Sequence, residues 1–200
     1  MKKLVRILLV CVTIASVCSC KAILIKIKGV SKPRFENKES VLNYLSTISP
    51  ESGDGVFVGQ DSLQFFHLLK MIKELPTVDF YNSKGELIEY SQTGGCNGKA
   101  EEFAEKLTRN MVYTVDSSYR MKDVEKKVVS IKENNGLLSQ DCDFVLFVYW
   151  AKYMGKMNQD VLDVMKALRN NKQLKAKVYL INMDFQSNWG MKKIPRINFN

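Results

Sequence analysis

The feature that most constrains this chain is the continuous apolar run Phe144–Trp150, which is rich in aromatic and β-branched residues. Such a run is typical of a central strand that is covered on both faces. A helical pattern over about 158–170 and a second apolar strand at 176–182 follow it. Strand, helix and strand predict a parallel, right-handed βαβ unit. The helix is expected to bury Val161, Leu162, Met165 and Leu168.

Patterns upstream of this unit predict further helices and strands and, with it, a single α/β domain over 39–200. Expected strands are Val56–Val58 and a hairpin of 76–81 with 86–90, joined by a turn that ends at Gly85. Expected helices are 39–48, 61–73, 99–110 and a heavily charged one at 120–133. In the helix at 61–73, the residues expected to face inward are Leu63, Phe66, Leu69, Met71 and Ile72.

The N-terminus has the build of a secretory signal peptide over residues 1–19. Lys2, Lys3 and Arg6 precede an eleven-residue apolar run over 7–17, and Lys21 closes the segment. A membrane-spanning helix needs about 20 apolar residues to cross about 30 Å of hydrocarbon. We therefore expect export rather than a transmembrane helix in the mature protein.

The end of this segment, Val17-Cys18-Ser19-Cys20, resembles the lipobox of bacterial lipoproteins. The resemblance implies that Cys20 becomes the lipidated residue and the mature N-terminus. Val17 stands where leucine is commoner, and Cys18 fills a position usually held by a small residue. The alternative is a conventionally cleaved signal without a lipid. The expected location is the bacterial cell envelope, with the protein lipid-anchored to the bilayer and facing the periplasm or the cell exterior.

The formal charge of +9 belongs to the N-terminus. Residues 1–19 carry +3, the segment 20–38 carries +5, and residues 39–200 carry only +1. The segment 20–38 is therefore expected to be a basic, membrane-proximal tether, whose lysines favour anionic headgroups. The main body lacks a basic stripe with interleaved aromatic residues, so we expect no nucleic-acid partner.

Cysteine usage leaves two thiols in the expected mature domain, Cys96 and Cys142. They either pair as a disulfide in an oxidising compartment or remain as two thiols. Asp141 and Asp143 flank Cys142 and raise the pKa expected of its thiol, which argues against an activated nucleophile. The single histidine, His67, lies on an expected amphipathic helix, so the sequence predicts no zinc site or other cofactor.

The βαβ unit resembles the redox module of the thioredoxin-like fold, as found in envelope thiol-disulfide proteins and peroxiredoxin relatives. In those proteins a buried strand ends in aromatic-Trp-Ala, and Cys-x-x-Cys opens the next helix. Here Tyr149-Trp150-Ala151 keeps that frame, but Met154 and Met157 occupy the cysteine positions. A thioether cannot ionise, attack or form a disulfide, so the resemblance implies a domain without the usual redox reaction.

The sequence is compatible with two arrangements of a thioredoxin-like domain with a central mixed sheet. The segment 75–88 resembles the proline-led hairpin near the end of that fold, where the proline is cis, and this makes the chain permuted with 99–110 as its last helix. It also resembles the hairpin before the first core strand of peroxiredoxin-like proteins, which implies a helical insertion at about 92–140. Ile194-Pro195 is the other candidate for the cis-proline position.

These observations favour a membrane-anchored binding or assembly protein, with an unidentified envelope protein as partner, over an enzyme. Two alternatives are open. Cys96 and Cys142 could approach in space and exchange disulfides with a partner thiol. Met154 and Met157 could instead bind copper, because thioethers are ligands that suit Cu(I).

Overall fold

A computed structural model describes residues 27–49, 53–72, 74–90, 98–132 and 142–196. The predicted signal peptide, Cys20 and Cys96 lie outside these ranges. Within them, no helix is both long and apolar enough to cross a membrane.

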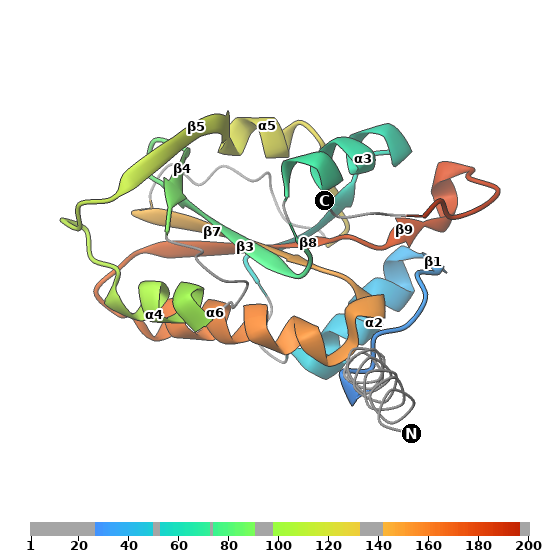
Figure 1. The fold of residues 1–200 in the computed structure, drawn as a ribbon, viewed down its shortest axis with the longest axis horizontal. Helices are drawn as coiled ribbons and strands as arrows, with labels where there is room; N and C mark the ends of the chain where they lie inside the picture. The colour runs from blue at the N-terminus through green and yellow to red at the C-terminus, as the bar shows by residue number, and fades with distance from the viewer. Residues whose placement is uncertain (1–26, 50–52, 73, 91–97, 133–141, 197–200) are drawn as a thin grey trace, which may run out of the picture.

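A mixed seven-stranded sheet forms the centre of the molecule (Figure 1). Its strands lie in the order β5-β4-β3-β7-β8-β2-β6. Strands β7, β8 and β2 are parallel to one another, whereas β3 and β6 run antiparallel to their neighbours at either side of this group. The strand bounds are β2 Gly55–Gly59, β3 Thr77–Asn82, β4 Glu86–Glu89, β5 Thr114–Arg120, β6 Val128–Ser130, β7 Phe144–Trp150 and β8 Ala176–Asn182.

The predicted βαβ unit is confirmed. Strand β7 pairs in parallel with β8 from Phe144↔Ala176 to Trp150↔Asn182, and helix α6 (Asn158–Asn170) connects them. All seven residues of β7 are buried, as expected of a strand between two layers. The four residues predicted for the inner face of α6 are buried too.

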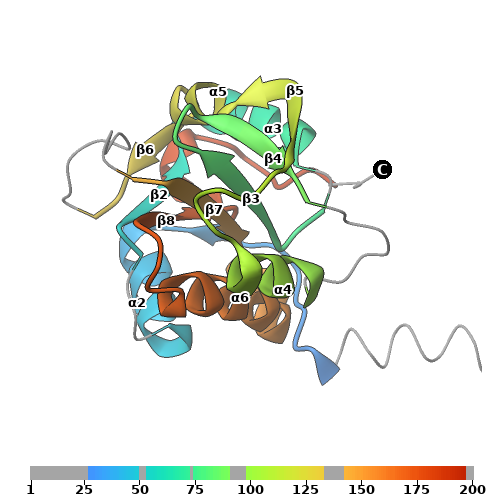
Figure 2. The ribbon, with the colours of Figure 1, turned by 90° about the vertical axis from the view of Figure 1, so that its left-hand side faces the viewer.

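Helices cover both faces of the sheet, in the three layers that Figure 2 shows edge-on. Helices α2 (Lys38–Ile48), α4 (Gly98–Lys106) and α6 pack on one face, while α3 (Ser62–Met71) and α5 (Met121–Glu125) pack on the other. Strand residues alternate between the two cores: Leu146 and Val148 belong to the first, and Phe147 and Tyr149 to the second. The architecture is therefore α/β, with an apolar core on each side of the sheet.

Four short elements lie near the ends of β7 and β8. Strand β1 (Phe35–Glu36) pairs in parallel with β9 (Phe185–Gln186), which follows β8 almost directly. A 3₁₀ segment, η1 (Lys152–Met157), connects β7 to α6, and a second, η2 (Ser187–Trp189), follows β9. These elements lie at the carboxyl ends of the central strands and surround the site described below.

Two predictions about the segment before β7 are wrong. The expected helix at 120–133 is only α5, because Val128–Ser130 leave the helix and pair with β2 as an edge strand. The proposed helical insertion at 92–140 is also not purely helical. Its described residues contribute β5 and β6, the two outer strands of the sheet. The β-branched residues Val128 and Val129 suit a strand once a partner edge exists, and sequence periodicity carries no record of that edge.

The inner face of α3 matches the prediction except at Leu63, but its most buried residues were not predicted. Asp61 caps the helix by accepting a hydrogen bond from the Gln64 N–H at 2.7 Å, but Phe65 and Leu68 are the buried residues. Of the residues predicted to face inward, Ile72 is buried, Phe66, Leu69 and Met71 are partly buried against the same core, and Leu63 is 59% exposed. Apolar residues lie on more than one side of this helix, so spacing alone did not identify Phe65 and Leu68 as its most buried residues.

Candidate functional site

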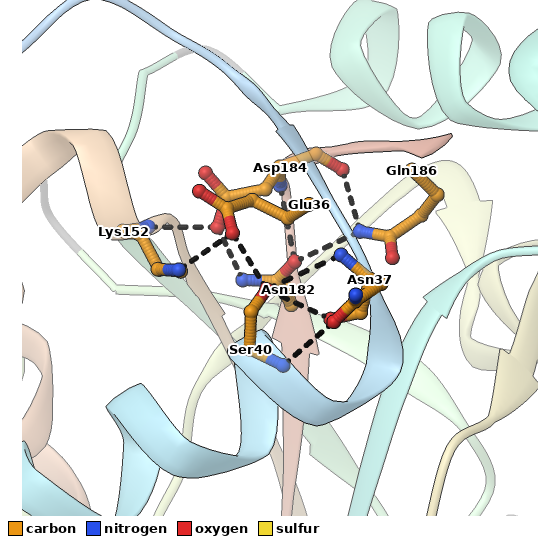
Figure 3. Close-up of polar contacts among 7 residues, drawn as sticks. All are labelled: Glu36, Asn37, Ser40, Lys152, Asn182, Asp184 and Gln186. Atoms are coloured by element: carbon orange, nitrogen blue, oxygen red, sulfur yellow. Dashed lines mark hydrogen bonds and ion pairs between the residues drawn. The ribbon is translucent and has the colours of Figure 1, made fainter. Parts of the chain in front are cut away.

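A cluster of polar side chains lies where β7 and β8 end, next to the segment that carries Met154 and Met157 (Figure 3). In open α/β sheets, ligand sites lie at the carboxyl ends of parallel strands. Strand β8 ends at Asn182, and the side chains of Asp184 and Gln186 follow at every second position. All three side chains are buried, so polar groups lie inside the protein at the carboxyl ends of these strands.

Asp184 is the centre of the cluster. Its Oδ2 accepts hydrogen bonds from the Lys152 backbone N–H at 2.8 Å and from the Asn182 amide at 2.7 Å. Its own N–H donates to Asn182 Oδ1 at 3.2 Å. The Asp184 carboxylate therefore links the end of β8 to the first residue of η1.

Gln186 completes the buried part of the cluster. Its side-chain amide donates to Asn182 Oδ1 at 3.3 Å and to the Asp184 carbonyl at 2.9 Å. Buried amides and carboxylates are tolerated only when such partners are present. These bonds fix the turn between β8 and β9.

A second carboxylate, Glu36 of β1, lies beside the buried group. Its Oε2 accepts the Lys152 ammonium at 2.5 Å and the Ser40 hydroxyl at 2.6 Å. Ser40 also forms a capping box with Asn37 at the start of α2. Because Lys152 binds Glu36 through its side chain and Asp184 through its backbone, it joins the N-terminal segment to the end of the sheet.

Burial sets the protonation of this site. Desolvation raises the pKa of Asp184 to about 6, while hydrogen bonds from Lys152 and Asn182 and the positive charge of Lys152 oppose the shift. The nearby Glu36 charge raises the same pKa. The Tyr153 pKa is raised by burial and by the charge of Asp184, and its buried hydroxyl has no hydrogen-bond partner. The cluster can thus take up a proton just below neutral pH.

The segment between β7 and α6 has a backbone conformation that glycine suits. Gly155 has φ 55° and ψ −130°, and a Cβ there would lie 2.5 Å from the Gly29 carbonyl oxygen. The Lys156 N–H donates to the Lys28 carbonyl, and the Ser31 N–H donates to the Tyr153 carbonyl, both at 2.8 Å. The chain that follows the predicted lipid anchor therefore lies directly against this segment.

The structure separates the residues that the sequence singled out. Met154 and Met157 are both half-buried at the β7–α6 connection, and Met154 packs against the core that contains Phe147. Cys142 lies before β7 and is half-buried against the same core. Cys20 and Cys96 are outside the described residues, so lipidation and the Cys96–Cys142 pairing stay predictions.

The chemistry of the cluster is that of a polar network rather than of a nucleophile or metal centre. The seven side chains in Figure 3 include no thiol and no imidazole. Throughout the described ranges, no three His, Cys, Asp or Glu side chains gather as metal ligands. What the network can do is hold η1 in place and exchange a proton at Asp184.

Sequence reasoning missed the partners of Asp184. Asn182, Asp184 and Gln186 alternate after an apolar strand, and this period of two was a usable signal for one buried polar face. Glu36 carried no such signal, because it lies 116 residues before its partner Lys152.

Comparison of this chain with protein-family models, with curated proteins and with solved structures finds no match. Any functional assignment therefore rests on its own residues and topology.

Proposed function

We propose that this chain is a lipid-anchored envelope protein whose permuted, thioredoxin-like domain has lost thiol chemistry and acts by binding a protein partner. The observation that carries the proposal is the position of Met154 and Met157. Both lie in the connection from the buried strand β7 to helix α6, where the thioredoxin-like family has its two cysteines. The buried Trp150 and Ala151 precede them in the family's register.

The order of the strands supports the permuted form of this fold. The unit β7-α6-β8 has the hairpin β3–β4 beside it, and α4 follows that hairpin and packs against α6. In the thioredoxin-like fold the equivalent hairpin and helix come at the end of the chain. Here they come after β2 and before β7, so the hairpin and helix are displaced in sequence but lie beside the β7-α6-β8 unit in space.

The proline ahead of β3 lies where the family resemblance expects it. The Leu75–Pro76 peptide is cis, and it is the only cis peptide bond in the described part of the chain, so Ile194–Pro195 does not take that role. Thr77 pairs with Tyr149, which puts Pro76 beside the end of β7 and the start of the methionine-bearing segment. A cis-proline next to the redox motif is what the family resemblance leads us to expect.

Chemistry then argues for binding over catalysis. Thiol exchange needs a thiolate that attacks and a second thiol that resolves the mixed disulfide. Methionine sulfur provides neither, and fold alone supplies no activity. The basic signal-like segment and Cys20 add the expected membrane location, where the partner is an envelope protein.

The proposal is tested by restoring the missing chemistry. A double variant, Met154→Cys with Met157→Cys, should form an internal disulfide under mild oxidation and reduce insulin in the presence of dithiothreitol, faster than dithiothreitol alone. The unaltered protein and each single variant should show no such acceleration. The readouts are a mass loss of about 2 Da on disulfide formation and insulin turbidity.

Two results would contradict the proposal. Robust insulin reduction by the unaltered protein would mean that its own cysteines are active. Failure of the two introduced cysteines to bond with each other in a folded double variant would mean that the connection does not have redox-motif geometry.

A further inference from the structure

A large cleft lies on the opposite side of the sheet from α4 and α6. Its volume is about 1250 Å³, and it is bordered by α3, by β5 with the following α5, and by strands β3 and β4. Figure 1 shows α3 and α5 on the same side of the sheet to which β3, β4 and β5 belong. Pockets that bury a small organic ligand have volumes of roughly 300–1,000 Å³, so the cleft has room for such a ligand.

The most unusual group in the cleft is the carboxyl of Asp79, in the middle of β3. The residue is 8% exposed, yet it lines the cleft. Its Oδ2 accepts the Tyr119 hydroxyl at 2.9 Å and, more weakly, the Tyr81 hydroxyl at 3.4 Å. The buried Tyr149 hydroxyl also lies near Asp79 but makes no hydrogen bond of good geometry. A buried carboxyl with three phenols around it therefore forms a built polar site in the wall of the cleft.

Within the described residues, Asp79 forms no ion pair. An unpaired buried carboxylate is costly, and the usual compensation is a positive partner. The lysines of the cleft do not provide one: Lys70 is exposed, and the Lys127 ammonium donates to the Asp123 backbone carbonyl at 2.7 Å. Among the described residues, therefore, no cation neutralises the Asp79 carboxylate.

The character of the lining identifies the class of ligand. Acidic residues outnumber lysines four to two among the residues that line the cleft: Asp79, Glu89, Asp116 and Asp123 against Lys70 and Lys127. This balance disfavours anions. A hard metal ion binds through several oxygen ligands. No group of three candidate ligands is found in the described ranges, which disfavours a metal ion as the ligand. Met71 and Leu87 add apolar surface, which suits a hydrocarbon stem.

We propose that the cleft between α3 and β5–α5 binds a small organic cation, with the Asp79 carboxylate as its counter-ion. An alkylammonium group fits this description: its charge meets Asp79, and its stem lies against Met71 and Leu87. The Tyr119 ring adds an aromatic wall, a surface to which organic cations are attracted. The proposal is independent of the lipid anchor and of the thioredoxin-like assignment, because only the described cleft carries it.

The test is a titration of the full-length protein in detergent micelles, with ¹³C-methyl-labelled methionines. The probe is n-butylammonium, compared with n-butanol and butyrate at equal concentrations up to about 10 mM. The Met71 methyl signal should shift and saturate with n-butylammonium alone. Met154, which is not among the residues lining the cleft, is the internal reference.

Two variants test whether the charge of Asp79 binds n-butylammonium. Asp79→Asn, which keeps the shape of the side chain, should weaken n-butylammonium binding by about tenfold or more. The matched control is Asp160→Asn, an exposed residue on α6 at the other face, which should change the affinity by less than about twofold.

Three results would overturn the proposal: no saturable shift of Met71, an equal shift with n-butanol, or unchanged binding in folded Asp79→Asn. The comparison between n-butylammonium and n-butanol uses the unaltered protein, so it stands even if the variant does not fold.

Discussion

Asp79 and Asp184 are the two described aspartates whose pKa burial raises to about 6. Hydrogen bonds from tyrosines lower the pKa of Asp79, and those from Lys152 and Asn182 lower the pKa of Asp184. In both cases the rise caused by desolvation is the larger effect. A folded-state pKa above the unfolded value means that the native protein binds protons more tightly than the unfolded chain. The contribution of these groups to stability is therefore fully present at low pH and is lost as pH rises through about 6.

Replacing Asp79 by asparagine should make the unfolding free energy less dependent on pH. Between about pH 4.5 and pH 7.5, Asp79→Asn should gain about 2 kcal/mol relative to the unaltered protein, because the variant has no buried carboxyl to ionise. Urea unfolding at the two pH values measures the difference. Tyr119 and Tyr81 keep their hydroxyls in the variant, and the oxygen of the introduced amide can still accept from one of them.

The exposed Asp160→Asn serves as the control, with a pH profile like that of the unaltered protein. If Asp79→Asn follows that same profile, Asp79 does not titrate near pH 6.

At the scale of elements, α3 shows how a helix with two apolar faces is oriented by its surroundings. Phe65 lies between the rings of Phe185 and Trp189, with centroid distances of 4.9 and 5.1 Å. These partners come from β9 and η2, more than a hundred residues along the chain. The sequence predicts that the segment is a helix and that Asp61 caps it, but the partners decide which face is buried.

Two alanine variants on α3 should therefore differ sharply in stability. Phe65→Ala should lower the free energy of unfolding by about 3–5 kcal/mol, because it leaves a cavity among aromatic rings. Leu63→Ala should change it by no more than about 0.5 kcal/mol, because that side chain is mostly exposed. Urea denaturation midpoints, with circular dichroism to confirm the helix content, give both values. The opposite ranking would restore the face predicted from the sequence.

At the scale of the whole molecule, the chain divides by charge into a basic N-terminal segment and a nearly neutral α/β body. Residues 1–38 hold +8 of the +9 formal charge. The first described residues, Lys28 to Ser31, bond to η1, so the proposed tether reaches the folded body at the methionine-bearing segment. This arrangement would hold that segment near the membrane surface.

Lipidation is checked most directly at Cys20. Cys20→Ser should abolish incorporation of labelled palmitate and move the protein out of the membrane fraction, because serine offers no thiol for the lipid. Cys18→Ser is the matched control and should keep both properties, since serine suits a small-residue position. Continued labelling of Cys20→Ser would contradict the assignment of the anchor.

The sequence by itself determined the elements whose signal is local. The run Phe144–Trp150, the periodicity of α6 and the turn at Gly85 each specify a conformation within a few residues. Where a local signal is compatible with two outcomes, the prediction was wrong, as for the helix expected over Val128–Ser130, or incomplete, as at α3, where Leu63 is exposed and Phe65 and Leu68 were missed.

The tertiary structure alone decided which distant residues meet. Tyr119 reaches Asp79 across 40 residues of chain, and Lys152 reaches Glu36 across 116. Strands β5 and β6 lie at the edges of the sheet because they pair with the backbone of β4 and β2, which would otherwise be unpaired there. Burial and long-range pairing are properties of the assembled sheet, and so are the raised pKa values of Asp79 and Asp184; no window of sequence contains them.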